Sequence, residues 1–173
     1  MQPHSDSQQT IQKLIEIVGK QHVLTQESET RLYRQGRRYG AGQVLAVVVP
    51  GTLLEQWQVL QAAVAADCIV IMQAANTGLT GGSTPFGDDY DRPVVLMSTR
   101  RLAGIQIIRD GQQVICLPGA TLDRLEKELA PFNREPHSVI GSSCIGASVL
   151  GGVCNNSGGA LVRRGPAYTE LAL

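Results

Sequence analysis

The stretch QAANTGLTGGST, residues 73–84, has the residue types of an anion-binding loop. It follows the apolar run CIVIM and contains three glycines, three threonines and a serine, but no charged residue. Glycines accept positive φ, so that successive main-chain N–H groups can point at one anion, and hydroxyls add further donors. An ordinary surface loop rich in turn residues is the alternative. The position after a buried strand, where α/β proteins bind ligands, favours the binding loop.

Two familiar nucleotide motifs do not match this loop. A Walker A loop needs a lysine after its glycines, and none is present here. The dinucleotide fingerprint GxGxxG opens a helix, whereas Gly78, Gly81 and Gly82 are spaced GxxGG and Pro85 follows them. The remaining hypothesis is a nest of main-chain amides around a diphosphate in a closed pocket.

A second glycine cluster, GSSCIGASVLGGVCNNSGG, covers residues 141–159. Ala147 and Gly151 are four residues apart, as are Ser148 and Gly152, so a helix here would present a face of small residues. That face predicts either close helix packing or a wall against which a planar ring lies. Taken together, the two clusters indicate one long ligand with a diphosphate and a heterocycle, which is the shape of FAD.

Hydrophobic periodicity predicts the first elements of the chain. A helix is expected over residues 7–19, ended by Gly19, with its apolar face formed by Ile11, Leu14, Ile15 and Val18. A second short helix is expected near residues 27–36. Short β-branched runs then predict strands at 44–50, 68–73 and 93–99.

The helix between the first two strands is expected to begin at Thr52, which has capping-box spacing to Glu55. Its apolar side chains on one face are Leu53, Trp57, Leu60 and Val64. A strand, a helix and a strand with short connections indicate a βαβ unit.

The pattern changes after residue 100. Asp110-Gly111 between two apolar runs predicts a type I′ hairpin, and residues 121–130 predict an amphipathic helix. The last five residues, TELAL, have the pattern of a strand that enters a sheet. We therefore expect the chain to be the N-terminal part of a longer protein.

Composition excludes several classes of function. The 173 residues include 15 basic and 15 acidic side chains, so there is no basic surface for nucleic acid. The densest basic cluster is interpreted as a solvated helix face and loop: Arg31, Arg34, Arg37 and Arg38. The four cysteines are predicted to be reduced, buried thiols, and with the three histidines they have no metal-ligand spacing.

Three segments, AANTGLTGGSTP, REPHSVIGSSCIGASVLGGVCNNSGG and RRGPAYTE, resemble the bacterial quinone-dependent respiratory D-lactate dehydrogenases. This family belongs to the vanillyl-alcohol-oxidase or PCMH-type flavoprotein group, and the similarity runs from about residue 8 to the end. It implies an α+β, PCMH-type FAD-binding fold with two α+β subdomains, the second incomplete here. Residues 1–40 would be a helical leader and 41–173 the FAD-binding domain, with subdomains at 44–100 and 104–173.

The resemblance also implies which residues bind FAD, held non-covalently. The diphosphate and its neighbours would contact Ala74, Ala75, Asn76, Thr77, Gly78, Gly82 and Ser83. The rest of the cofactor, including the flavin side, would contact Gly141, Ser148 and Gly158. His137 is interpreted as a structural loop histidine, in preference to a covalent flavin tether.

The activity that the resemblance implies is oxidation of D-lactate to pyruvate. A hydride passes from the substrate C2 to flavin N5, and the electrons pass to a membrane quinone. The family's catalytic residues and its membrane contact lie beyond this chain, so no catalytic residue is expected here. The expected location is peripheral, at the cytoplasmic face of the bacterial inner membrane. Alternatives are a glycolate or 2-hydroxyglutarate enzyme with the same cofactor half, or a non-catalytic nucleotide-binding module, which would be colourless.

Overall fold

The computed structural model describes residues 3–87, 90–136, 145–157, 168–170 and 172. The chain divides into two compact units, Met1–Arg101 and Leu102–Leu173. The subdomain bounds 44–100 and 104–173 stay a prediction, as does the leader over 1–40. The first helix of that leader packs into the core of the first unit.

The first unit is built on a four-stranded sheet in the order β1-β2-β4-β3. Its strands are β1 (Val23–Leu24), β2 (Ala46–Val48), β3 (Ile69–Gln73) and β4 (Val94–Ser98). β4 pairs in parallel with both β2 and β3, and β1 pairs antiparallel with β2. The three predicted strands are confirmed. The proposed βαβ unit spans two sheet positions, because β4 lies between β2 and β3.

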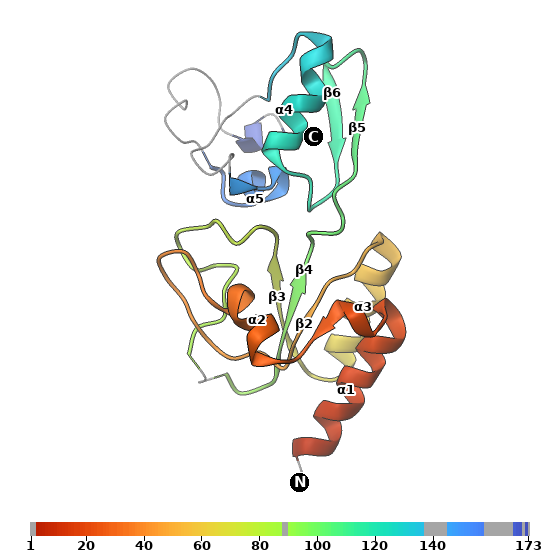
Figure 1. Cartoon of the computed structure of the whole chain (residues 1–173), viewed down its shortest axis with the longest axis vertical. Helices are drawn as coiled ribbons and strands as arrows, with labels where there is room; N and C mark the ends of the chain where they lie inside the picture. Colours follow the sequence, from red (N-terminus) through yellow and green to blue (C-terminus); the bar gives the residue numbers. More distant parts are fainter. Residues whose placement is uncertain (1–2, 88–89, 137–144, 158–167, 171, 173) are drawn as a thin grey trace. The chain divides into compact units, whose positions relative to one another are not determined.

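Helices cover both faces of this sheet (Figure 1). α1 (Pro3–Val18) and α3 (Leu53–Ala65) pack on one face, and α2 (Glu27–Arg34) lies on the other. The residues of β2 and β4 alternate between the two cores, since successive side chains on a strand point to opposite faces. Double coverage explains why β2 is apolar throughout and β4 is apolar up to its last residue, Ser98.

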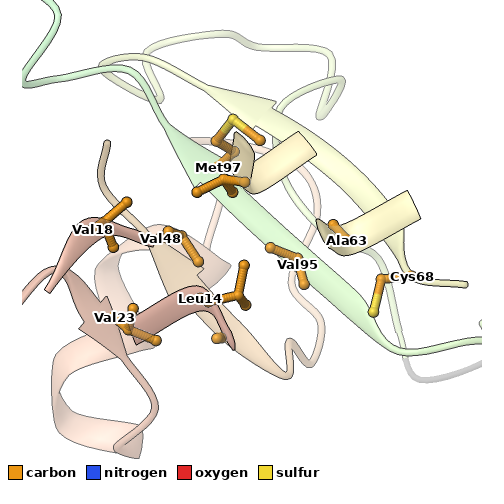
Figure 2. Packing of buried hydrophobic residues seen from close by; sticks show 10 residues of the cluster. Leu14, Val18, Val23, Val48, Ala63, Cys68, Val95 and Met97 are labelled. Atoms are coloured by element: carbon orange, nitrogen blue, oxygen red, sulfur yellow. The ribbon is translucent and has the colours of Figure 1, made fainter. Parts of the chain in front are cut away.

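The larger core lies between the sheet and the pair α1 and α3, and Figure 2 shows how its side chains meet. Leu14 is fully buried there against Val48 and Val95 of the central strands. The predicted helix 7–19 is confirmed, with α1 ending at Val18 and Gly19 taking a φ of 86°. A glycine accepts that angle without steric strain, which makes it a suitable end for a helix.

α3 begins where it was predicted, because the Thr52 hydroxyl accepts a hydrogen bond from the amide of Glu55. Its buried residues are Val59 and Ala63. The side chains that share the other apolar face are exposed: Leu53, Leu54, Trp57, Leu60 and Val64. The helix is apolar on more than one side, so periodicity alone did not identify the side that packs on the sheet.

The second unit contains the hairpin β5 (Ile105–Ile108) and β6 (Gln113–Cys116). Asp110 and Gly111 both have positive φ, as a type I′ turn requires, so the predicted hairpin is confirmed. The predicted helix is α4 (Leu122–Leu129), which the Thr121 hydroxyl caps.

Short elements complete the described residues. They are the six-residue α5 (Val149–Cys154) and the 3₁₀ turns η1 (Lys20–His22), η2 (Ala130–Phe132) and η5 (Tyr168–Glu170). The strand expected for TELAL is wrong over Thr169 and Glu170, which lie in η5. Five residues of β-like composition do not specify a strand when no partner strand pairs with them in the described residues.

Candidate functional site

The predicted anion-binding loop leaves the carboxyl end of β3 and is anchored at its first residue. Gln73 is buried, and its Nε2 donates hydrogen bonds to the main-chain oxygens of Tyr33, at 2.9 Å, and Ser83, at 2.7 Å. One side chain therefore ties the two ends of the loop to each other and to α2.

Asn76 organises the interior of the loop. It has a φ of 54°, in the left-handed region that asparagine tolerates better than most residues. Its Nδ2 donates to the Gln35 oxygen at 2.8 Å. Its Oδ1 accepts from the hydroxyls of Thr84, at 3.0 Å, and Ser83, at 3.3 Å. The side chains of Asn76 and Ser83 therefore hold the loop in shape.

The main-chain amides of this loop are unusually free. Among the residues that the structure describes, none of the eight consecutive amides of residues 76–83 donates a hydrogen bond. The next amide, that of Thr84, donates to the Gly81 oxygen at 3.1 Å and closes the loop. Unpaired amides next to residues that accept positive φ are the donor set of an anion nest.

The glycines of the loop separate into two kinds. Gly81 has a φ of 77°, and a Cβ there would lie 3.0 Å from the Tyr39 ring, so the fold itself requires glycine. Among the described residues, a Cβ at Gly78 or at Gly82 would meet no atom within 4 Å, and neither residue has a positive φ. No contact in the described residues of the first unit requires glycine at these two positions. The open space beside free amides fits a ligand that approaches the main chain closely.

The predicted residues of the first unit thus lie on one continuous loop. Ala74, Ala75 and Thr77 are half-buried, whereas Gly78 and Gly82 are exposed. Two residues that sequence reasoning missed lie at the same edge of the sheet. Ser98, which pairs with Gln73, and Thr99 have buried hydroxyls with no hydrogen-bond partner in the described residues. Hydroxyl residues at the end of a parallel strand were the available signal.

Of the residues predicted in the second unit, the structure describes Ser148. Its hydroxyl accepts a hydrogen bond from the amide of Gly151 at 3.0 Å and caps α5. Gly141, Gly158 and His137 lie outside the described residues. A Cβ at Gly152 would lie 3.1 Å from the Tyr168 ring, so close packing accounts for this glycine. Burial raises the pKa of Tyr168 to about 12.

The arginine cluster does not form one solvated face, so that interpretation is wrong for Arg34. This residue is buried, and its guanidinium contacts the Glu27 carboxylate and the Gln43 side chain. Its charge is compensated locally, because a buried cation needs a partner. Arg31, Arg37 and Arg38 are exposed.

The cysteines also differ from the prediction in part. Cys68 is buried and Cys116 is half-buried, and burial raises the pKa of both thiols. Cys154 is exposed because it is at the end of the short helix α5. The structure shows no group of three metal-ligating side chains within its described ranges.

The sequence of residues 44–169 matches the family described as FAD binding domain. This chain belongs to that FAD-binding domain family. The matched residues include the loop of residues 76–83 and α5. The cofactor predicted from the two glycine clusters is therefore confirmed as FAD at the level of the family.

Two relatives extend this comparison. The quinone-dependent D-lactate dehydrogenase of Haemophilus influenzae is 63% identical over 166 residues, or 96% of this chain and 29% of that protein. The enzyme of the same name from Escherichia coli is 60% identical over 169 residues, or 98% and 30%. The resemblance proposed from the sequence is confirmed. The chain spans about 30% of the length of these curated relatives.

Solved structures confirm the fold. Alkyldihydroxyacetonephosphate synthase matches all of this chain and 33% of its own, with a TM-score of 0.84 and 14% identity. p-Cresol methylhydroxylase matches 89% of this chain and 30% of its own, with a TM-score of 0.72 and 18% identity. The α+β, PCMH-type FAD-binding fold predicted from the sequence is therefore correct. In the described part of the chain, every helix is too short or too polar to span a bilayer.

Proposed function

We propose that this chain is the FAD-binding part of a flavoprotein dehydrogenase that oxidises D-lactate to pyruvate. The observation that carries the proposal is the loop over residues 76–83, which has eight free amides and open space at Gly78 and Gly82 in the part of the chain that the structure describes. The names of the relatives at 63% and 60% identity supply the substrate and the acceptor class.

In this proposal the loop binds the FAD diphosphate without a covalent bond. Its contact residues are Ala74, Ala75, Asn76, Thr77, Gly78, Gly82 and Ser83. Main-chain amides suit this role because they are fixed by the fold and need no reorganisation when the anion arrives. Gly141, Ser148 and Gly158 contact the remaining part of the cofactor, including the flavin side.

Bound FAD would supply a two-electron acceptor for the substrate hydride. The residues of this chain hold the cofactor, and we assign no proton transfer to them. The electrons then pass to a membrane quinone. We place the protein peripherally at the cytoplasmic face of the bacterial inner membrane, with the membrane contact made by residues outside this chain and no role in binding nucleic acid.

The test uses the protein produced from its complete reading frame. The purified protein is expected to be yellow, with a flavin absorption band and about one FAD per polypeptide, released by denaturation alone. D-lactate should bleach that band and reduce a soluble quinone analogue, whereas L-lactate should do neither. A colourless protein that binds no added FAD would refute the proposal and favour a non-catalytic nucleotide-binding module.

The choice of substrate is tested in the same assay. Glycolate and D-2-hydroxyglutarate are compared with D-lactate at equal concentrations, and kcat/KM is measured for each. D-lactate is expected to have the highest value. A higher kcat/KM for either of the other acids would refute D-lactate as the preferred substrate. It would not affect the proposed FAD-binding role, because the loop contacts only the cofactor in this proposal.

A further inference from the structure

The loop of residues 76–83 brings no cation to a diphosphate, although that group carries two negative charges. A short hairpin from elsewhere in the chain lies next to it. Gln35 and Ala41 form an antiparallel bridge, and the Gly36 amide donates to the Gly40 oxygen at 2.8 Å. The residues at the tip of this hairpin are Arg37, Arg38 and Tyr39.

Several contacts fix this hairpin, residues 35–41, against the loop. The Tyr39 ring lies 3.0 Å from the Cβ position of Gly81, and the Cβ position of Gly40 lies 3.2 Å from Thr84. Asn76 donates to the Gln35 oxygen at 2.8 Å. The hairpin thus contacts the loop near both of its ends.

An aromatic pair joins the tip of the hairpin to the residues that follow the loop. The rings of Tyr39 and Phe86 stack with their centroids 5.4 Å apart and their planes 12° from parallel. Stacking of this kind adds stability beyond the burial of the rings, although both residues are largely exposed. The position of the hairpin tip is therefore set by packing and does not depend on the two arginines beside Tyr39.

Arg37 and Arg38 have no partner in the described part of the chain. Both are exposed, and neither makes an ion pair or a hydrogen bond there. Arg34, three residues earlier, is by contrast buried and paired with Glu27. The hairpin that carries these two arginines thus contacts the loop whose eight amides are unpaired in the described residues, and residues 73–84 include no acidic side chain.

We propose that Arg37 and Arg38 form the cationic half of the diphosphate site and bind the phosphate oxygens of the dinucleotide together with the amides of residues 76–83. This inference rests on the proposed function. The arginine fork matches phosphate oxygens in a bidentate geometry, and such charge-assisted bonds are stronger than neutral ones. The charge that the loop lacks in sequence is thus supplied about 40 residues upstream.

The test compares FAD binding by two double variants of the complete protein. Apoprotein carrying Arg37→Gln and Arg38→Gln is titrated with FAD, and Kd is measured from flavin fluorescence over a range of salt concentrations. The matched control carries Lys13→Gln and Lys20→Gln, which remove the same charge from exposed positions on α1 and η1. The arginine variant is expected to bind FAD about 10- to 100-fold more weakly than the control, with a smaller salt dependence.

Equal Kd values and equal salt dependence in the two double variants would overturn the inference. Should the double arginine variant not fold, Arg37→Gln and Arg38→Gln are tested singly, and one of them must weaken FAD binding at least about fivefold. This failure is distinct from failure of the proposed function. If the wild type binds FAD and the Gly82→Val variant does not, the assignment of the loop to the diphosphate stands, and only the role of the two arginines is refuted.

Discussion

The sharpest test of the cofactor loop is the contrast between two neighbouring glycines. Gly82 has an ordinary backbone φ, and a side chain there would enter open space, so the fold itself tolerates valine. Such a change alters the free energy of unfolding of the apoprotein by less than about 1 kcal/mol. At Gly81 the φ of 77° and the Tyr39 ring 3.0 Å away oppose any side chain. Gly81→Ala should therefore destabilise the apoprotein by about 1–2 kcal/mol.

For FAD binding, the two substitutions are expected to rank in the opposite order, with Gly82→Val causing the larger loss. Valine at position 82 would occupy the space through which the diphosphate approaches the amides. Loss of two charge-assisted hydrogen bonds, at about 1.5–3 kcal/mol each, weakens binding by about 3–6 kcal/mol. This corresponds to about a 10²- to 10⁴-fold rise in Kd, so Gly82→Val should purify without flavin. Gly81→Ala should retain more FAD at low temperature, because its methyl group points at Tyr39.

Both variants are made in the complete protein and measured in the same two ways. Thermal unfolding of the apo forms gives stability without the contribution of bound cofactor, and the ratio of flavin to protein absorbance gives occupancy. A Gly82→Val protein with stoichiometric FAD would refute the assignment of this loop to the diphosphate. A Gly82→Val apoprotein that unfolds earlier than Gly81→Ala would refute the distinction between the two glycines.

Three further outcomes are expected from the described contacts. Asn76→Ala should lower the free energy of unfolding by about 2 kcal/mol in urea titrations, since alanine is strained at a φ of 54° and cannot make the side-chain bonds; an unchanged midpoint would contradict this. In α3, Val59→Ala should cost about 2 kcal/mol, whereas exposed Trp57→Gln should change stability by less than about 0.5 kcal/mol, and equal effects would contradict the packing described. The pKa of Tyr168 is about 12 in the folded protein and near 10 in the unfolded chain, so the folded state retains the phenolic proton between these values. Stability should fall as pH rises through that window, and Tyr168→Phe should reduce the fall; an identical alkaline unfolding profile in the variant would contradict it.

Local sequence signals predicted most elements of the fold because their causes are local. The 3.6-residue period of α1, the glycine at its end and the threonine before α3 act within a few residues of where they stand. The same holds for Asp110-Gly111, whose positive φ values define the hairpin turn. The two glycine clusters and the resemblance to the D-lactate dehydrogenases, both features of the sequence, predicted FAD.

Other features were decided by contacts between distant parts of the chain. β4 enters the sheet between β2 and β3, because strand order follows from long-range pairing that no single segment encodes. α3 turns Val59 toward the sheet and leaves Trp57 exposed, since apolar residues on several sides of a helix compete for one buried face.

The sequence by itself determined that residues 73–84 form a glycine-rich loop free of charge after a buried strand. Only the tertiary structure decided which of its glycines the fold requires, and which space is left open at Gly78 and Gly82. It also placed the hairpin with Arg37 and Arg38 beside that loop, about 40 residues away in the chain. The physical reason is that a binding site is a property of proximity, and proximity between separate segments is set by the packing of the whole core.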